Sequence, residues 1–205
     1  MPAILAKKLG MTQRFLDDGR VERVTVLEAG PCPVTAIRTH EADGYEAVQL
    51  GFGAVREKAL NKPLLGHLKK ASAPPVRTLV EFRDEAGELT VGDTVTVEVF
   101  EVGQVVKVAG VAKGKGFQGT IKRHNFNAGP KAHGSHNVRA PGSIGASATP
   151  SRVFKGIRGP GHMGAKRVTQ KGLTIVELLP EQNLMLVRGS VPGPKGGTVE
   201  VRTDA

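Results

Sequence analysis

The chain has 205 residues, of which 39% are apolar and 27 are glycine, a composition typical of a folded chain with one or two domains. No apolar run approaches the ~20 residues that span a bilayer, and the short apolar stretch before Lys7 predicts no signal peptide. The single cysteine, Cys32, excludes an internal disulfide and favours a cytoplasmic location.

The first half of the chain is predicted to be mainly β-structure. Residues 94–99 alternate polar and apolar side chains, as a half-buried strand does. One helix is predicted at 63–71, with Pro63 in its first turn and Leu64, Leu68 and Ala71 on one face, and no other segment has a useful helical period. Further short strands are predicted at 21–27, 34–38, 46–50 and 76–82, with turns at Asp17-Asp18-Gly19, Asp43-Gly44 and Glu85-Ala86-Gly87.

The last forty residues are predicted to be β-structure as well. Residues 173–179 and 184–187 are apolar runs that predict an antiparallel hairpin, and 198–202 alternate like a strand. Many short strands with glycine-rich turns predict a closed barrel or a sandwich, and a barrel is favoured because closure removes exposed edges. Each flank alone has too few strands. We therefore expect one barrel body formed by 1–112 and 166–205, with 113–165 as an excursion from it.

The excess positive charge belongs to one stretch of the chain. Residues 102–176 contain no Asp or Glu but 13 of the 29 Lys and Arg residues, and the rest of the chain has a net charge of −3. A merely solvated basic face would tolerate some carboxylates over such a length, so a polyanionic partner is the better interpretation. Within this carboxylate-free stretch, residues 113–165 contain 11 glycines. They contain only 8 Leu, Ile, Val or Phe among 53 residues, which is too few to form a core. This segment is expected to become ordered on its partner.

Gly114-Lys115-Gly116-Phe117-Gln118-Gly119 matches a dinucleotide-binding pattern. Such a site requires a helix after the glycines and an acidic residue about 20 positions later. No helical pattern follows, and Glu177 is the next carboxylate. The glycines are better explained as allowing a close backbone approach to phosphates, with neighbouring lysines supplying charge.

Other sites have weaker support. His133-Gly-Ser-His136 lacks a further ligand for zinc, and its histidines suit phosphate or base contacts instead. No catalytic constellation stands out, so no catalytic residue, metal, cofactor or small-molecule substrate is expected. Phe117, Phe126 and Phe154 have two open interpretations, base stacking or a small local apolar cluster. A coreless basic segment that must contact its partner along its length favours folded RNA over a simple duplex.

Several blocks occur in an order that resembles one known family. They are Lys7-Lys8-Leu9-Gly10-Met11-Thr12, Asp43-Gly44-Tyr45, Lys113 to Arg123, His133-Gly-Ser-His136, Pro141-Gly-Ser-Ile-Gly145, Arg152-Val-Phe-Lys-Gly156 and Gly161-His-Met-Gly164. The chain resembles, essentially end to end, the bacterial form of the ribosomal protein L3 family of the 50S subunit. The resemblance implies a six-stranded Greek-key barrel of the translation-protein type with a long basic extension.

The resemblance also implies a function. Family members bind 23S ribosomal RNA near its 3′ domain, help to start subunit assembly and send the extension toward the peptidyl-transferase centre, here with a tip at about 136–155. Neighbouring large-subunit proteins fourteen and nineteen are implied as partners. Many bacterial members carry a methylated glutamine before a Thr-Pro pair, but Ala148 stands at this position, and Ala112 replaces the usual small hydroxyl residue before Lys113.

The predicted function is therefore a structural, non-enzymatic component of the large ribosomal subunit, located in the cytoplasm and not bound to a membrane. Two alternatives remain open, a non-ribosomal protein that compacts nucleic acid and, with less support, a flavin- or nucleotide-binding barrel enzyme. The candidate rRNA-binding residues are Lys113, Lys115, Lys122, Arg123, Lys131, His133, His136, Arg139, Arg152, Lys155, Arg158, Lys166 and Arg167.

Overall fold

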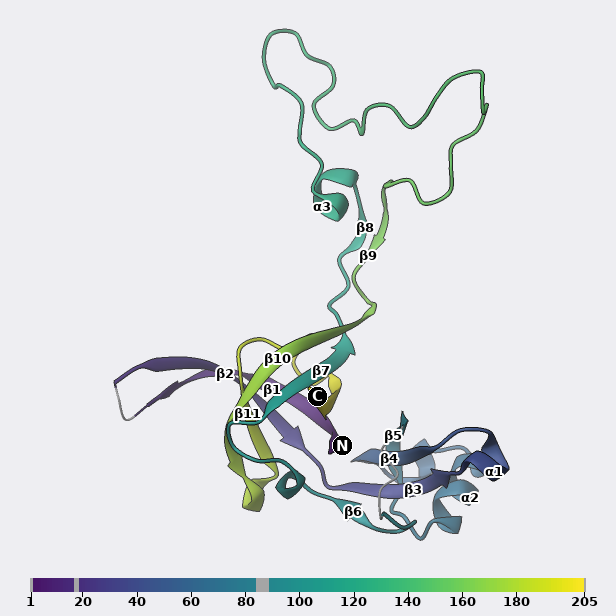
Figure 1. The fold of residues 1–205 in the computed structure, drawn as a ribbon, viewed down its shortest axis with the longest axis vertical. Coiled ribbons are helices and arrows are strands. Elements are labelled where there is room, and N and C mark those ends of the chain that lie inside the picture. The colour runs from purple at the N-terminus through teal and green to yellow at the C-terminus, as the bar shows by residue number, and fades with distance from the viewer. Residues whose placement is uncertain (1, 17–18, 84–88, 205) are drawn as a thin grey trace. The chain divides into compact units, whose positions relative to one another are not determined.

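The structure is a computed structural model that describes residues 2–16, 19–83 and 89–204 (Figure 1). The turn predicted at Asp17-Asp18-Gly19 lies largely outside these residues, and the turn predicted at Glu85-Ala86-Gly87 lies wholly outside them. The chain divides into two units. We call residues 1–112 with 167–205 the body, and residues 113–166 the arm.

Six antiparallel strands close a barrel in the body, in the order β1-β12-β7-β10-β11-β2. Strand β12 returns beside β7 after β7, β10 and β11 have followed one another, which is a Greek-key arrangement. The predicted closed barrel is confirmed. Its strands are β1 (Ala3–Phe15), β2 (Val21–Ala29), β7 (Val105–Val111), β10 (Arg167–Leu179), β11 (Leu184–Arg188) and β12 (Thr198–Thr203).

Alternation of side chains explains the inner face of the barrel. In β12, Val199 and Val201 are buried while Thr198 is exposed, because successive side chains of a strand point to opposite faces. Gly110 of the neighbouring β7 leaves room for this packing. A Cβ atom at position 110 would lie 2.9 Å from Val199 Cγ1.

The two longest strands, β1 and β10, are irregular along their length. The register of β1 against β2 shifts between Lys8 and Gly10, and that of β10 against β7 shifts between Gln170 and Leu173. Such bulges bend a strand and increase its local twist. They let a strand of 13 residues curve within a closed barrel.

A second sheet in the body has the order β5-β4-β3-β6 (Figure 1). Its strands are β3 (Cys32–Arg38), β4 (Ala47–Ala54), β5 (Val76–Arg83) and β6 (Thr94–Val95). The strands predicted at 34–38, 46–50 and 76–82 are thus confirmed as strands, but their assignment to the barrel is wrong. Alternation shows that a strand has a buried face, whereas it does not show which layer covers that face.

The strand predicted at 94–99 is also largely wrong. Only Thr94–Val95 is a strand, and Val97–Val99 is a short 3-10 helix in which the Phe100 N–H donates to the Val97 carbonyl at 3.2 Å. This turn buries both Val97 and Phe100. A continuing strand would have placed these two residues, three apart, on opposite faces.

The predicted helix is confirmed as α2 (Lys62–Lys70), with Pro63 in its first turn and with Leu68 and Ala71 buried. The other two α-helices, α1 (His40–Asp43) and α3 (Thr120–His124), each form about one turn and were not predicted. Such short turns carry no helical period in the sequence. The remaining 3-10 turns are Glu57–Ala59 and Pro180–Gln182, the second of which joins the predicted hairpin of β10 and β11.

One apolar core runs through the barrel and the second sheet. It includes Ile4 and Val106 from the barrel and Val48 and Phe82 from the second sheet. Cys32 is buried there, and burial raises the pKa of its thiol to about 12, so the thiol stays protonated at neutral pH. The two layers therefore stabilise each other through shared apolar contacts.

We expect Asn61→Ala to lower the free energy of unfolding by about 1 kcal/mol. The Asn61 side-chain oxygen accepts a hydrogen bond from the Leu64 N–H at 3.0 Å and so caps the first turn of α2. Denaturant titration measures the change. Asn61→Asp keeps an acceptor at the cap and should stay close to the wild-type chain, so equal losses in both variants would contradict the capping role.

Candidate nucleic-acid interface

Acidic and basic side chains are matched in the body but not in the arm. In the body, Arg14 pairs with Glu177 at 3.1 Å and Arg188 with Glu22 at 3.4 Å. The arm has no Asp or Glu in its sequence, so its cations have no carboxylate of their own segment to pair with. The positive charge of the arm is therefore available for an external anion.

The thirteen candidate side chains differ in how freely they reach solvent. Arg123 is half-buried. The other candidates are exposed, namely Lys113, Lys115, Lys122, Lys131, His133, His136, Arg139, Arg152, Lys155, Arg158, Lys166 and Arg167. Lysine and arginine heads in water supply both charge and hydrogen-bond donors to phosphate oxygens.

The two ends of the arm pair with each other. Strand β8 (Gly116–Gln118) runs antiparallel to β9 (Gly161–Met163) (Figure 1). The Lys115 N–H extends this ladder by donating to the Met163 carbonyl at 2.8 Å. Between α3 and β9 no helix or strand is formed. The arm is thus a paired base that carries a long irregular segment, residues 125–160.

Arg123 has a role within the arm. Its Nη1 donates to the Gly159 carbonyl at 2.7 Å, and His124 Nε2 lies 3.1 Å from the same oxygen. These contacts join α3 to the chain just before β9 and so close the irregular segment at its base. Arg123, half-buried and engaged, is the candidate least available to a phosphate.

Close backbone approaches explain part of the glycine content of the arm. Gly164 has φ = +75°, and a Cβ atom there would overlap the Lys113 carbonyl oxygen. Gly129 donates its N–H to the Val138 carbonyl at 3.0 Å, and a Cβ atom on Gly129 would overlap the Asn137 carbonyl oxygen. Only glycine fits both positions without displacing backbone.

The glycine block 114–119 differs from its expected surroundings. Although the sequence shows no helical pattern there, the short helix α3 begins at Thr120, directly after Gly119. Strand β7 ends at Val111, just before the block, but a second strand, β8, lies within the block, and α3 has five residues. In a dinucleotide site the glycines form a tight turn that leads into a full helix, so this geometry differs from that site.

Arg167 lies in the body rather than in the arm, at the start of β10. Its Nε donates to Glu200 Oε1 at 3.3 Å, and this hydrogen bond raises the pKa of Arg167 above its usual value. Glu200 also lies 3.6 Å from Arg202 Nη2. Arg167 therefore belongs to an ion-pair cluster on the barrel and is set apart from the other twelve candidates.

Two features of the arm could not be predicted from the sequence. Phe117 of β8 stands opposite His162 of β9, although the two residues are far apart in the chain, and Phe117 is 76% exposed. Arg152 lies over the Phe154 ring at 5.1 Å from its centroid. The glycine-rich sequence shows no periodicity that would indicate either register or ring contact.

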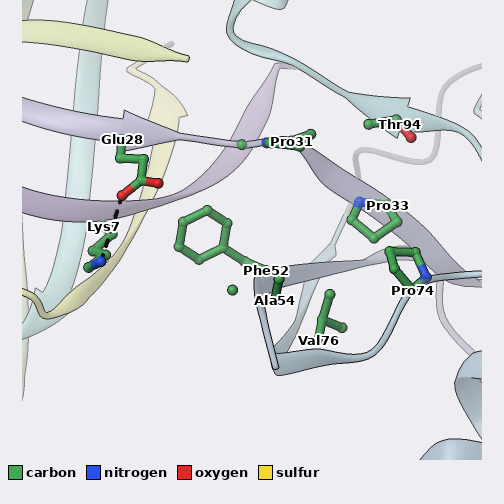
Figure 2. Close-up of a pocket in the computed structure, with 11 residues that line it drawn as sticks. Lys7, Glu28, Pro31, Pro33, Phe52, Ala54, Pro74, Val76 and Thr94 are labelled. Atoms are coloured by element: carbon green, nitrogen blue, oxygen red, sulfur yellow. Dashed lines mark ion pairs between the residues drawn. The ribbon is translucent and has the colours of Figure 1, made fainter. Parts of the chain in front are cut away.

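A cavity of about 460 Å³ lies in the body (Figure 2). Among the described side chains that line it, the charged ones are Lys7 and Glu28, whose Nζ and Oε2 atoms are 3.8 Å apart. One cation facing one carboxylate gives no net positive charge for a phosphate-bearing cofactor. The other lining residues are Gly30, Pro31, Pro33, Phe52, Gly53, Ala54, Pro74, Val76 and Thr94.

Within residues 2–16, 19–83 and 89–204, no three His, Cys, Asp or Glu side chains come together as a metal site would require. In the same part of the chain, no helix has the length and apolar character needed to cross a membrane.

The body has matched charges, whereas the arm is basic and has no carboxylate. This combination is typical of proteins that bind an extended polyanion such as a nucleic acid. Residues 75–183 match the family model described as Ribosomal protein L3. The chain is 57% identical over 204 residues to the large ribosomal subunit protein uL3 of Acidothermus cellulolyticus, an alignment that covers 98% of this chain and 92% of the relative. The chain belongs to the ribosomal protein L3 family.

Proposed function

We propose that the chain is a structural component of the large ribosomal subunit in the cytoplasm and binds 23S rRNA through its arm. The observation that carries the proposal is the location of the cations: the arm has no carboxylate, and its candidate side chains other than Arg123 are exposed. Membership of the ribosomal protein L3 family supports it.

Membership of the ribosomal protein L3 family implies further features of this function. The arm binds near the 3′ domain of 23S rRNA, its tip at about 136–155 extends toward the peptidyl-transferase centre, and binding helps to start subunit assembly. Large-subunit proteins fourteen and nineteen are its neighbours. The irregular segment 125–160 supports a role inside folded RNA, because a chain without a wide secondary structure fits narrow spaces between phosphates.

Binding is expected to be steeply salt-dependent. If about half of the 13 basic residues in 102–176 contact phosphates, log K for 23S rRNA should fall with log salt at a slope of about −5. Filter binding to a full-length 23S rRNA transcript between 50 and 300 mM KCl measures the slope. A random-sequence duplex of equal length serves as competitor. A slope near zero contradicts the proposal, and equal affinity for the duplex favours the compaction alternative.

The arm is expected to become ordered on RNA. In the isolated protein, amide hydrogens of residues 125–160 should exchange freely, because this segment has no helix or strand, while those of β7, β10 and β12 stay protected. On binding 23S rRNA, exchange in 125–160 should slow. Hydrogen exchange read by mass spectrometry compares the two states, and full protection of the free arm would disprove coupled ordering.

A further inference from the structure

The most exposed aromatic side chain of the arm lies on its paired base. Phe117 in β8 is 76% exposed, and its cross-strand partner His162 in β9 is also exposed. Directly opposed residues of an antiparallel pair have Cβ atoms about 5 Å apart and share one face. The register therefore places a benzyl side chain and an imidazole side chain on the same face of this strand pair.

The other face of the strand pair is covered. A side chain at position 161 would lie on the face opposite that of His162, since side chains alternate along a strand. A Cβ atom on Gly161 would lie 2.8 Å from Arg123 Nη1, so the Arg123 side chain occupies that side. Arg123 is fixed there by its hydrogen bond to the Gly159 carbonyl. The face of Phe117 and His162 is therefore the open one.

Charge identifies the occupant of the open face. The strand pair is flanked in sequence by Lys113, Lys115 and Lys166, all exposed, and no carboxylate occurs anywhere in the arm. An aromatic ring that packed into an apolar pocket of another protein would gain no stabilisation from the positive charge of these lysines. A nucleotide can bind both the aromatic ring and the lysines, because its base stacks on the ring while its phosphate pairs with a lysine.

We propose that Phe117 and His162 form a base-stacking platform for an unpaired nucleotide of folded RNA. The proposal deepens the function proposed above and rests on it. It also decides between the two interpretations of Phe117, because a ring that anchored a local apolar cluster would be buried rather than 76% exposed.

Affinity measurements with full-length 23S rRNA test the platform. Phe117→Ala should weaken binding by about 5- to 150-fold, the range found when one base–aromatic stack is removed. The salt slope should stay unchanged, because no charge is lost. Phe117→Tyr keeps the ring and should bind like the wild-type chain. Lys115→Gln is the matched comparison, and it should make the slope about one unit shallower.

A fluorescence measurement tests the stacking directly. The chain has no tryptophan, so Phe117→Trp introduces a single indole at the platform. Its emission should be strongly quenched on binding 23S rRNA. Phe15→Trp places an indole at another exposed position, 65% exposed in β1 of the body, and should show little quenching.

The outcomes separate the platform from the general function. Wild-type affinity for Phe117→Ala, a change in its salt slope, or equal quenching at positions 117 and 15 would overturn the platform while leaving salt-dependent rRNA binding intact. If the wild-type chain itself binds 23S rRNA without a salt slope, the proposed function fails instead. Thermal melting of Phe117→Ala should match the wild-type chain, because an exposed ring contributes little to stability.

Discussion

Replacing the six lysines of the arm by glutamine is expected to weaken binding to 23S rRNA by about two to three orders of magnitude at 0.1 M salt. Each phosphate contact releases about 0.9 counterion, which corresponds to roughly eightfold in affinity at this salt concentration, and about three of the six lysines should contact phosphates. The salt slope should fall from about −5 to between −2 and −3. The substituted residues are Lys113, Lys115, Lys122, Lys131, Lys155 and Lys166.

The control variant changes the net charge by the same amount outside the arm. It should keep most of the affinity and of the salt slope, because its lysines lie in the part of the chain where acidic residues balance basic ones. Equal losses in both variants would show that net charge rather than the arm determines binding. The control positions are Lys7, Lys58, Lys62, Lys69, Lys70 and Lys195, all exposed.

The second large effect concerns the stability of the body. We expect Phe82→Ala to lower the free energy of unfolding by about 3–5 kcal/mol and Tm by about 6–20 °C. Phe82 is 1% exposed in the core shared by the barrel and the second sheet, and Arg202 of β12 lies 4.6 Å from its ring centroid. Truncation removes apolar contacts in both layers and leaves a cavity that neighbouring strands cannot readily fill.

Phe15→Ala is the matched control, because it removes the same atoms from a ring that is 65% exposed. Its free energy of unfolding should stay within about 0.5 kcal/mol of the wild-type value. Denaturant titration and thermal melting compare the three chains. Similar stability for Phe82→Ala and the wild-type chain would show that the second sheet does not share a core with the barrel.

Local patterns predicted the longest helix and most strands of the body, but not β1 or β7, because burial of one face leaves a period in the sequence only where side chains alternate. Thr198–Thr203 alternates and is β12, and α2 begins with Pro63 in its first turn as predicted. The prediction failed at Val97–Val99, where two buried residues three apart required a turn instead of an extended strand. A period of two over six residues cannot distinguish these cases, since neighbouring layers decide which side chains are buried.

The candidate binding segment could be read from composition, whereas its internal geometry could not. The carboxylate-free stretch from 102 to 176 contains the whole arm. It is visible without a structure, because the charge of a segment follows from its residue types and not from its contacts. Two contacts in the arm join residues more than thirty positions apart in a stretch without periodicity. They are the hydrogen bond from Arg123 to the Gly159 carbonyl and the pairing of Phe117 with His162.

The sequence alone determined that this protein has a β-rich body and a coreless, uniformly basic segment. Both follow from the charge and hydropathy of individual residues and from their local alternation, which need no knowledge of tertiary contacts. Tertiary structure decided that the predicted strands divide between a closed barrel and a second sheet, and that Phe117 stands on an open face. Both depend on which distant segments meet, and register between distant strands is set by the packing of the whole chain.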